Sequence, residues 1–118
     1  MKTKVLIVED EQKLARSLAL LLQRQGMEVW SAGDIDSAMA LAAEVHPDVL
    51  VVDWMLKAHS DGLDLAECLR RGGLDCRVIV ISGYPSTDLE SRLAHLKVDG
   101  FLAKPFPPED LLAMIQPR

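Results

Sequence analysis

The sequence has no excess of positive charge. Its 118 residues include 13 Lys and Arg against 18 Asp and Glu, which gives a formal net charge of -5. Proteins that bind nucleic acid directly need a basic surface to contact the phosphates. The charge balance therefore argues against direct nucleic-acid binding, and we interpret it as a contribution to solubility.

Cysteines and long apolar runs are also scarce. Cys68 and Cys76 are the two cysteines, and their spacing fits neither a disulfide framework nor a zinc site, which favours a reducing compartment. No apolar stretch reaches the ~20 residues that span a membrane. The N-terminal Met1–Lys4 leads straight into a strand pattern without the apolar core of a signal peptide. We therefore expect a cytoplasmic protein without a membrane partner.

Short apolar runs, by contrast, recur along the chain. Each is too short for a helix and ends abruptly in polar residues, as is typical of a strand buried on both faces of a parallel sheet. A fifth segment, Met27–Ser31, mixes polar and apolar residues and predicts an edge strand. The four apolar runs are Val5–Val8, Val49–Val52, Val78–Ile81 and Gly100–Ala103.

Helical spacing of apolar residues fills the intervals between these strands. It predicts helices over residues 11–25, 35–45, 61–71, 87–96 and 108–116, with Asp34 as the N-cap of the second. Five strand–helix units predict a single α/β domain over residues 1–118, a doubly wound parallel sheet with right-handed crossovers. If the edge-like second strand lies outside the first, the strand order is 2-1-3-4-5.

Polar residues follow the predicted strands. Glu9 and Asp10 follow the first strand, Asp53 the third, Ser82 the fourth and Lys104 the fifth. Two carboxylates ~4 Å apart repel each other by ~4 kcal/mol at an effective dielectric of ~20, so this cluster needs either a bound proton or a cation. Mg²⁺ suits a few hard oxygen ligands, and the lysine and hydroxyl suit a phosphoryl group. The set predicts a Mg²⁺-assisted phosphoryl acceptor, because a carboxylate can form an aspartyl phosphate.

Together these segments resemble the receiver domain of bacterial two-component response regulators, and the resemblance runs almost end to end. It implies a flavodoxin-like fold and a signalling protein that is no enzyme beyond its own phosphorylation and dephosphorylation. It further implies a sensor histidine kinase or phosphotransfer protein as phosphodonor, and a downstream protein target or effector domain. The segments that carry the resemblance are Val5–Glu11, Val51–Met55, Asp61–Gly62, Val80–Gly83 and Phe101–Phe106.

The resemblance assigns roles at the acidic cluster. It implies that Asp53 is the phosphorylated aspartate. Mg²⁺ would be bound directly by Asp10, by Asp53 and by the main-chain carbonyl of Met55. Glu9 would act on the metal through water.

The resemblance also implies a conformational switch. Ser82 and Lys104 would hold the phosphoryl oxygens, and Phe101 would be the aromatic residue that moves together with Ser82. The peptide bond before Pro105 would be cis, an isomer that proline makes accessible.

The sequence departs from the usual receiver pattern in two places. Lys57 stands where a proline is usual, and the segment Leu56–Ser60 is one residue longer than usual before Asp61–Gly62. The last helix is also shorter than usual, on the face that receivers commonly use for output or dimerisation. Whether the chain forms a dimer through that face therefore stays open, as do the role of the Lys57–Ser60 loop, the cognate kinase, the output and the extent of the whole protein.

Other functions fit the residues less well. In a hydrolase with an aspartate nucleophile, a second acid stands two residues after the first, whereas Asp10 is followed by Glu11 and Gln12. A flavodoxin-like ligand module needs a glycine- or serine-rich phosphate loop after the first strand. A docking module without chemistry would not need both Asp53 and Lys104, although simple strand-end caps remain an alternative interpretation of the acids.

Overall fold

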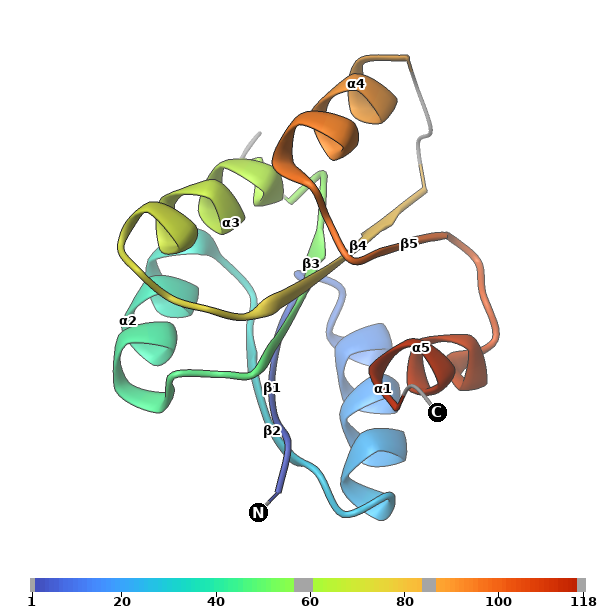
Figure 1. The fold of residues 1–118 in the computed structure, drawn as a ribbon. Helices are drawn as coiled ribbons and strands as arrows, with labels where there is room; N and C mark the ends of the chain where they lie inside the picture. The colour runs from blue at the N-terminus through green and yellow to red at the C-terminus, as the bar shows by residue number, and fades with distance from the viewer. Residues whose placement is uncertain (1, 57–60, 84–86, 117–118) are drawn as a thin grey trace.

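The computed structural model describes residues 2–56, 61–83 and 87–116 (Figure 1). Strands and helices alternate throughout. The strands are β1 (Lys4–Val8), β2 (Glu28–Ala32), β3 (Val49–Asp53), β4 (Arg77–Ser82) and β5 (Gly100–Ala103). The helices are α1 (Gln12–Arg24), α2 (Ile35–Val45), α3 (Gly62–Arg71), α4 (Thr87–Leu96) and α5 (Pro108–Ile115).

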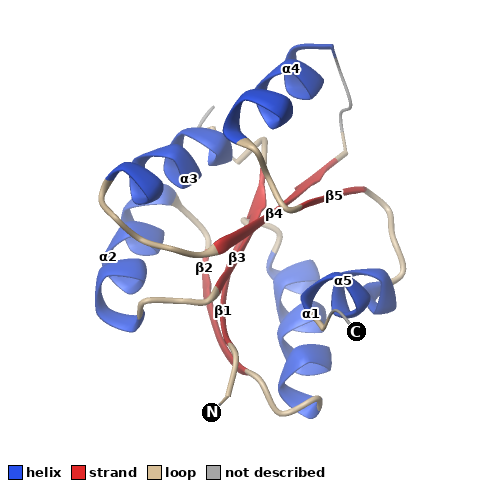
Figure 2. Ribbon diagram, in the orientation of Figure 1, coloured by secondary structure: helices blue, strands red, loops and turns tan. Residues whose placement is uncertain are grey.

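The five strands form one parallel sheet in the order β2-β1-β3-β4-β5, which confirms the predicted fold. Figure 2 shows the twisted sheet between two layers of helices. Helices α1 and α5 pack on one face, and α2, α3 and α4 pack on the other. Because β1 and β3 are neighbours, their carboxyl ends lie side by side at the point where the strand order reverses.

Burial explains the contrast among the strand sequences. Almost every residue of β1, β3 and β4 is buried, as their unbroken apolar runs predict. In the edge strand β2 only Ala32 is buried, and the strand lies one residue later than predicted, with Met27 buried just before it. The other edge strand, β5, is also mostly partly exposed. Central strands meet helices on both faces, whereas edge strands have one side without a partner strand.

Local capping fixes where α2 begins. Asp34 is extended and its Oδ1 accepts a hydrogen bond of 2.8 Å from the Ser37 N–H, as predicted. Hydrogen bonds from the main chain and hydroxyl of Ser37 lower the pKa of Asp34. Among the described residues, no helix is both long and apolar enough to cross a membrane.

Candidate functional site

The carboxyl ends of β1 and β3 bring three carboxylates together. Glu9 and Asp10 follow β1 and Asp53 ends β3, and one carboxylate oxygen of each lies within 4.8 Å of the others. Glu9 and Asp53 are buried, while Asp10 is partly exposed. Hard oxygen donors at this separation, two of them withdrawn from water, fit a divalent cation such as Mg²⁺.

Lys104 enters the cluster from the end of β5. Its Nζ lies 2.8 Å from Oδ2 of Asp53 and 2.7 Å from Oε1 of Glu9. Partial burial by itself would lower the pKa of Lys104, but its contacts with the two carboxylates raise the pKa above the ordinary lysine value. The lysine is therefore fully charged at neutral pH. The peptide bond between Lys104 and Pro105 is cis, which confirms that expectation.

Glu9 has a strongly raised pKa. Burial, helped by the nearby charge of Asp53, raises its pKa from 4.5 to about 7, although Lys104 and the Glu11 N–H act to lower it. The Glu11 N–H donates to Oε2 at 3.1 Å. Oε1 forms the ion pair with Lys104 but has no well-aligned hydrogen bond. Glu9 can therefore take up a proton near neutral pH, one of the two solutions that the sequence predicts for this cluster.

Both oxygens of Asp53 have donors. Oδ1 accepts from the Met55 N–H at 3.1 Å, and Oδ2 accepts from Lys104 at 2.8 Å. The Met55 side chain is exposed, so the position of this residue depends mainly on its main chain. That main chain forms an isolated antiparallel bridge with Asp61. The structure thus places Met55 between the candidate phosphoacceptor and the start of α3.

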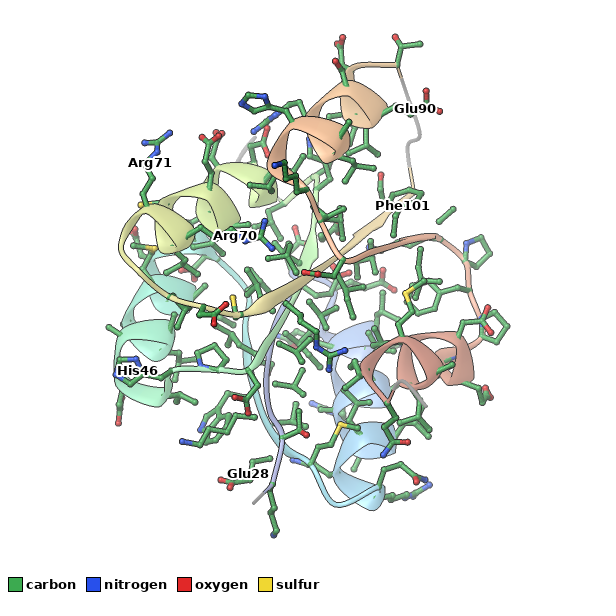
Figure 3. The ribbon with its side chains drawn as sticks, viewed as in Figure 1. Glu28, His46, Arg70, Arg71, Glu90 and Phe101 are labelled. Carbon is green, nitrogen blue, oxygen red and sulfur yellow. The ribbon has the colours of Figure 1, made fainter. Side chains whose placement is uncertain are left out.

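The two candidate switch residues lie on β4 and β5. Ser82 is the last residue of β4, is fully buried, and accepts a main-chain hydrogen bond of 2.7 Å from the Lys104 N–H. Phe101 is partly buried on β5, where it pairs with Val80 and packs against the core on the α2–α4 side (Figure 3). The structure therefore brings Ser82 to the edge that carries the acids. Movement of Ser82 and Phe101 stays a prediction.

Sequence reasoning missed Arg92. From α4, its guanidinium donates to Asp61 and, at 2.8 Å, to Asp64, both near the start of α3. No local pattern points to this contact, because the partners lie about thirty residues away in the sequence. The expectations about Lys57–Ser60 concern residues outside those described.

Comparison with known proteins agrees with this geometry. The family model described as the response regulator receiver domain matches residues 5–116. The phosphate regulon transcriptional regulatory protein PhoB of Klebsiella pneumoniae is 31% identical over 98% of this chain and 51% of its own length. The DNA-binding response regulator MtrA of Mycobacterium leprae is 29% identical over 100% of this chain and 52% of its own length. The chain thus spans about half the length of these curated relatives.

Solved structures give the same result. The chemotaxis protein CheY4 of Vibrio cholerae superposes with a TM-score of 0.90 at 26% identity, covering 98% of each chain. The receiver domain of the Francisella response regulator 1452 superposes with a TM-score of 0.86 at 29% identity, covering 97% of this chain and 93% of that one. A match over nearly the whole chain, with acids, hydroxyl and lysine at the expected strand ends, leads to one conclusion: the chain belongs to the response regulator receiver domain family.

Proposed function

We propose that this receiver domain accepts a phosphoryl group on Asp53, in a Mg²⁺-dependent reaction, from a sensor histidine kinase or a phosphotransfer protein. The observation that carries the proposal is the environment of Asp53: a buried carboxylate, held by Lys104 at 2.8 Å, beside two further acids. Apart from turning over its own phosphoryl group, the domain catalyses no reaction.

The chemical step follows from the nucleophile. An oxygen of Asp53 attacks the phosphorus of a phosphohistidine, an O–P bond forms, and the P–N bond breaks with its electron pair going to the imidazole, which takes a proton from solvent. Lys104 stabilises the added charge because its Nζ already contacts the Asp53 carboxylate. Mg²⁺ bound by Asp10, by Asp53 and by the Met55 carbonyl, with Glu9 acting through water, would neutralise the transferred oxygens.

The conformational switch of Ser82 and Phe101 would begin with the negative charge of the new phosphoryl group. A phosphoryl group on Asp53 offers acceptor oxygens at the edge where Ser82 ends β4. If the Ser82 hydroxyl turns towards them, the space that it leaves allows Phe101 on β5 to turn inwards. Such a change shifts an existing equilibrium, so the unphosphorylated domain samples both arrangements.

The relatives support a regulatory output. PhoB is named a transcriptional regulatory protein and MtrA a DNA-binding response regulator. We infer that the phosphorylated domain controls a downstream protein target or an effector domain in the cytoplasm, and that it does not contact nucleic acid itself. The formal charge of -5 agrees with that division.

Mass spectrometry after incubation with acetyl phosphate and Mg²⁺ tests the proposal. Wild-type protein should gain the mass of one phosphoryl group, and Asp53→Asn should gain none, because the amide is not a comparable nucleophile. The exposed Asp36 on α2 offers a matched control, since Asp36→Asn makes the same chemical change away from the site. A mass gain that persists in Asp53→Asn would place the phosphoacceptor elsewhere.

A further inference from the structure

Arg92 joins α4 to α3 with a forked contact. Its Nη1 donates to Oδ2 of Asp61, and its Nη2 donates to Oδ1 of Asp64 at 2.8 Å. The Arg92 and Asp61 side chains are 37% and 27% exposed, so this pair is partly withdrawn from water. Because both guanidinium nitrogens are engaged, the contact fixes an orientation as well as a distance.

Asp61 connects the Arg92 contact to the main chain at the start of α3. Its other oxygen, Oδ1, accepts from the Leu63 N–H at 2.8 Å and so caps α3. Its main chain bridges to Met55, and the next N–H, from Gly62, donates to the Trp54 carbonyl at 3.0 Å. Asp61 is therefore fixed to α3, to α4 and to the segment that follows β3.

Met55 connects Asp61 to the acidic cluster of Glu9, Asp10 and Asp53. Its N–H donates to Asp53, and its side chain is 46% exposed, so its position depends on the main-chain contacts on either side. We propose that Arg92 is a positioning residue for the metal site: through Asp61 it fixes the main chain of Met55 and thereby strengthens the binding of Mg²⁺. The inference rests on the proposed function, in which the Met55 carbonyl is a metal ligand.

A second arginine joins the same helices at their other ends. Arg70 on α3 donates to the carbonyls of Leu96, at 2.5 Å, and Lys97, at 3.2 Å, and pairs with Asp99 at 3.3 Å (Figure 3). Within the part of the chain that the structure describes, Arg70 and these partners form no hydrogen bond with Asp61 or Met55. Arg70 therefore fixes α4 without touching the metal site, which makes it a matched control for Arg92.

Coupling of this kind acts in both directions. If Arg92 strengthens Mg²⁺ binding, then bound Mg²⁺ must stabilise the position of α4 by the same free energy. A partner that moves α4 and separates Arg92 from Asp61 then weakens the metal site. Within Thr87–Leu96, Leu89 is buried and Leu93 and Leu96 are partly buried against the core, whereas α3 buries three leucines. Apolar packing therefore opposes a movement of α4 less than a movement of α3.

Magnesium titrations followed by amide NMR shifts at residues 53–55 test the inference. Arg92→Gln should raise the Kd for Mg²⁺ about three- to ten-fold, less than the roughly 10–100-fold typical when a direct partner of a metal ligand is lost. Removing a positive charge near the acids would by itself strengthen binding of a cation, so weaker binding identifies positioning. Arg92→Lys keeps the charge but not the fork, and should lie between wild type and Arg92→Gln.

Two further measurements complete the test. Mg²⁺ should slow amide hydrogen exchange in residues 87–96 of the wild type but not of Arg92→Gln, and Arg70→Gln should keep the wild-type Kd. An unchanged or lower Kd in Arg92→Gln, or an equal rise in Arg70→Gln, overturns the inference.

The experiment distinguishes failure of the proposed metal site from failure of the proposed role of Arg92. Asp10→Ala removes a proposed ligand and should weaken Mg²⁺ binding whatever Arg92 does. A wild type that binds no Mg²⁺, or binds it no better than Asp10→Ala, contradicts the proposed metal site itself. A wild type that binds Mg²⁺ better than Asp10→Ala, but no better than Arg92→Gln, contradicts only the role of Arg92.

Discussion

Helices α1 and α4, on opposite faces of the sheet, are held in different ways. On one face, α1 buries Ala15, Leu18 and Leu22, and α5 packs beside it in the same apolar cluster. On the other face, α4 buries Leu89, packs Leu93 and Leu96 partly buried against the core, and is joined to α3 by arginine contacts at both ends. Apolar burial is strong but non-directional, whereas charge-assisted hydrogen bonds are directional and depend on nearby charges. The α1–α5 layer is therefore a fixed support, and α4 is the helix placed to respond to the site.

The largest expected effect is a loss of stability in the apolar layer. Leu18 is fully buried in α1, so Leu18→Ala should lower the free energy of unfolding by about 2–5 kcal/mol. Arg92→Gln should cost less than about 1 kcal/mol, because its contacts are partly exposed. Urea denaturation of both variants measures the difference. Equal losses would mean that α4 is held as firmly as α1 and would break the comparison.

A smaller loss of stability is expected when Gly62 is replaced by alanine. A Cβ there would lie against the main-chain oxygen of Asp53 and 2.6 Å from Cγ2 of Val52, so a rigid strand would have to shift. Gly62→Ala should cost about 1–3 kcal/mol and should also weaken Mg²⁺ binding, because the strand carries Asp53.

Gly100 provides the control for that substitution on the other face. A Cβ there would lie 2.9 Å from Sδ of Met114, the end of a flexible side chain on α5 that can move aside. Gly100→Ala should therefore cost less than Gly62→Ala and leave the Mg²⁺ affinity unchanged. Thermal denaturation and the same metal titrations measure both properties. A larger loss of Mg²⁺ affinity in Gly100→Ala than in Gly62→Ala would contradict the placement of the metal site at the end of β3.

The most gradual expected effect is a pH dependence of stability. The pKa of Glu9 is raised to about 7 from 4.5, so the folded state binds this proton more tightly than the unfolded state. Stability from this group is therefore complete below about pH 4.5 and is lost as the pH rises through about 7. At ~1.4 kcal/mol per pKa unit, this rise corresponds to a change in stability of up to roughly 3 kcal/mol, spread over the interval between the two pKa values.

Urea denaturation with a metal chelator, at about pH 5 and about pH 8, checks this expectation. Relative to wild type, Glu9→Gln should be more stable at the higher pH than at the lower one. Leu18→Ala serves as the control, because a change in the apolar layer should shift stability equally at both. An equal difference between Glu9→Gln and wild type at both pH values would refute the raised pKa of Glu9.

The sequence by itself determined the fold and most of the site. Unbroken apolar runs predicted the central strands, and the mixed run before Ala32 predicted an edge, because burial on one or two faces leaves a local periodic pattern. Parallel strands share one carboxyl edge, so acids that end strands had to meet there. The strand ends alone therefore predict that Glu9, Asp53 and Lys104 lie together, and the contacts of 2.7 Å and 2.8 Å agree.

Tertiary structure alone decided how neighbouring residues differ and which distant ones meet. Glu9 and Asp10 are adjacent carboxylates, yet Glu9 is 2% exposed and Asp10 is partly exposed. Local spacing cannot distinguish them, because burial and the approach of Lys104 depend on packing by other elements. Arg92 likewise lies on an ordinary helix, and its reach to Asp61 follows from the placement of α4 beside α3. Long-range packing sets such contacts, and no periodic pattern in the sequence encodes them.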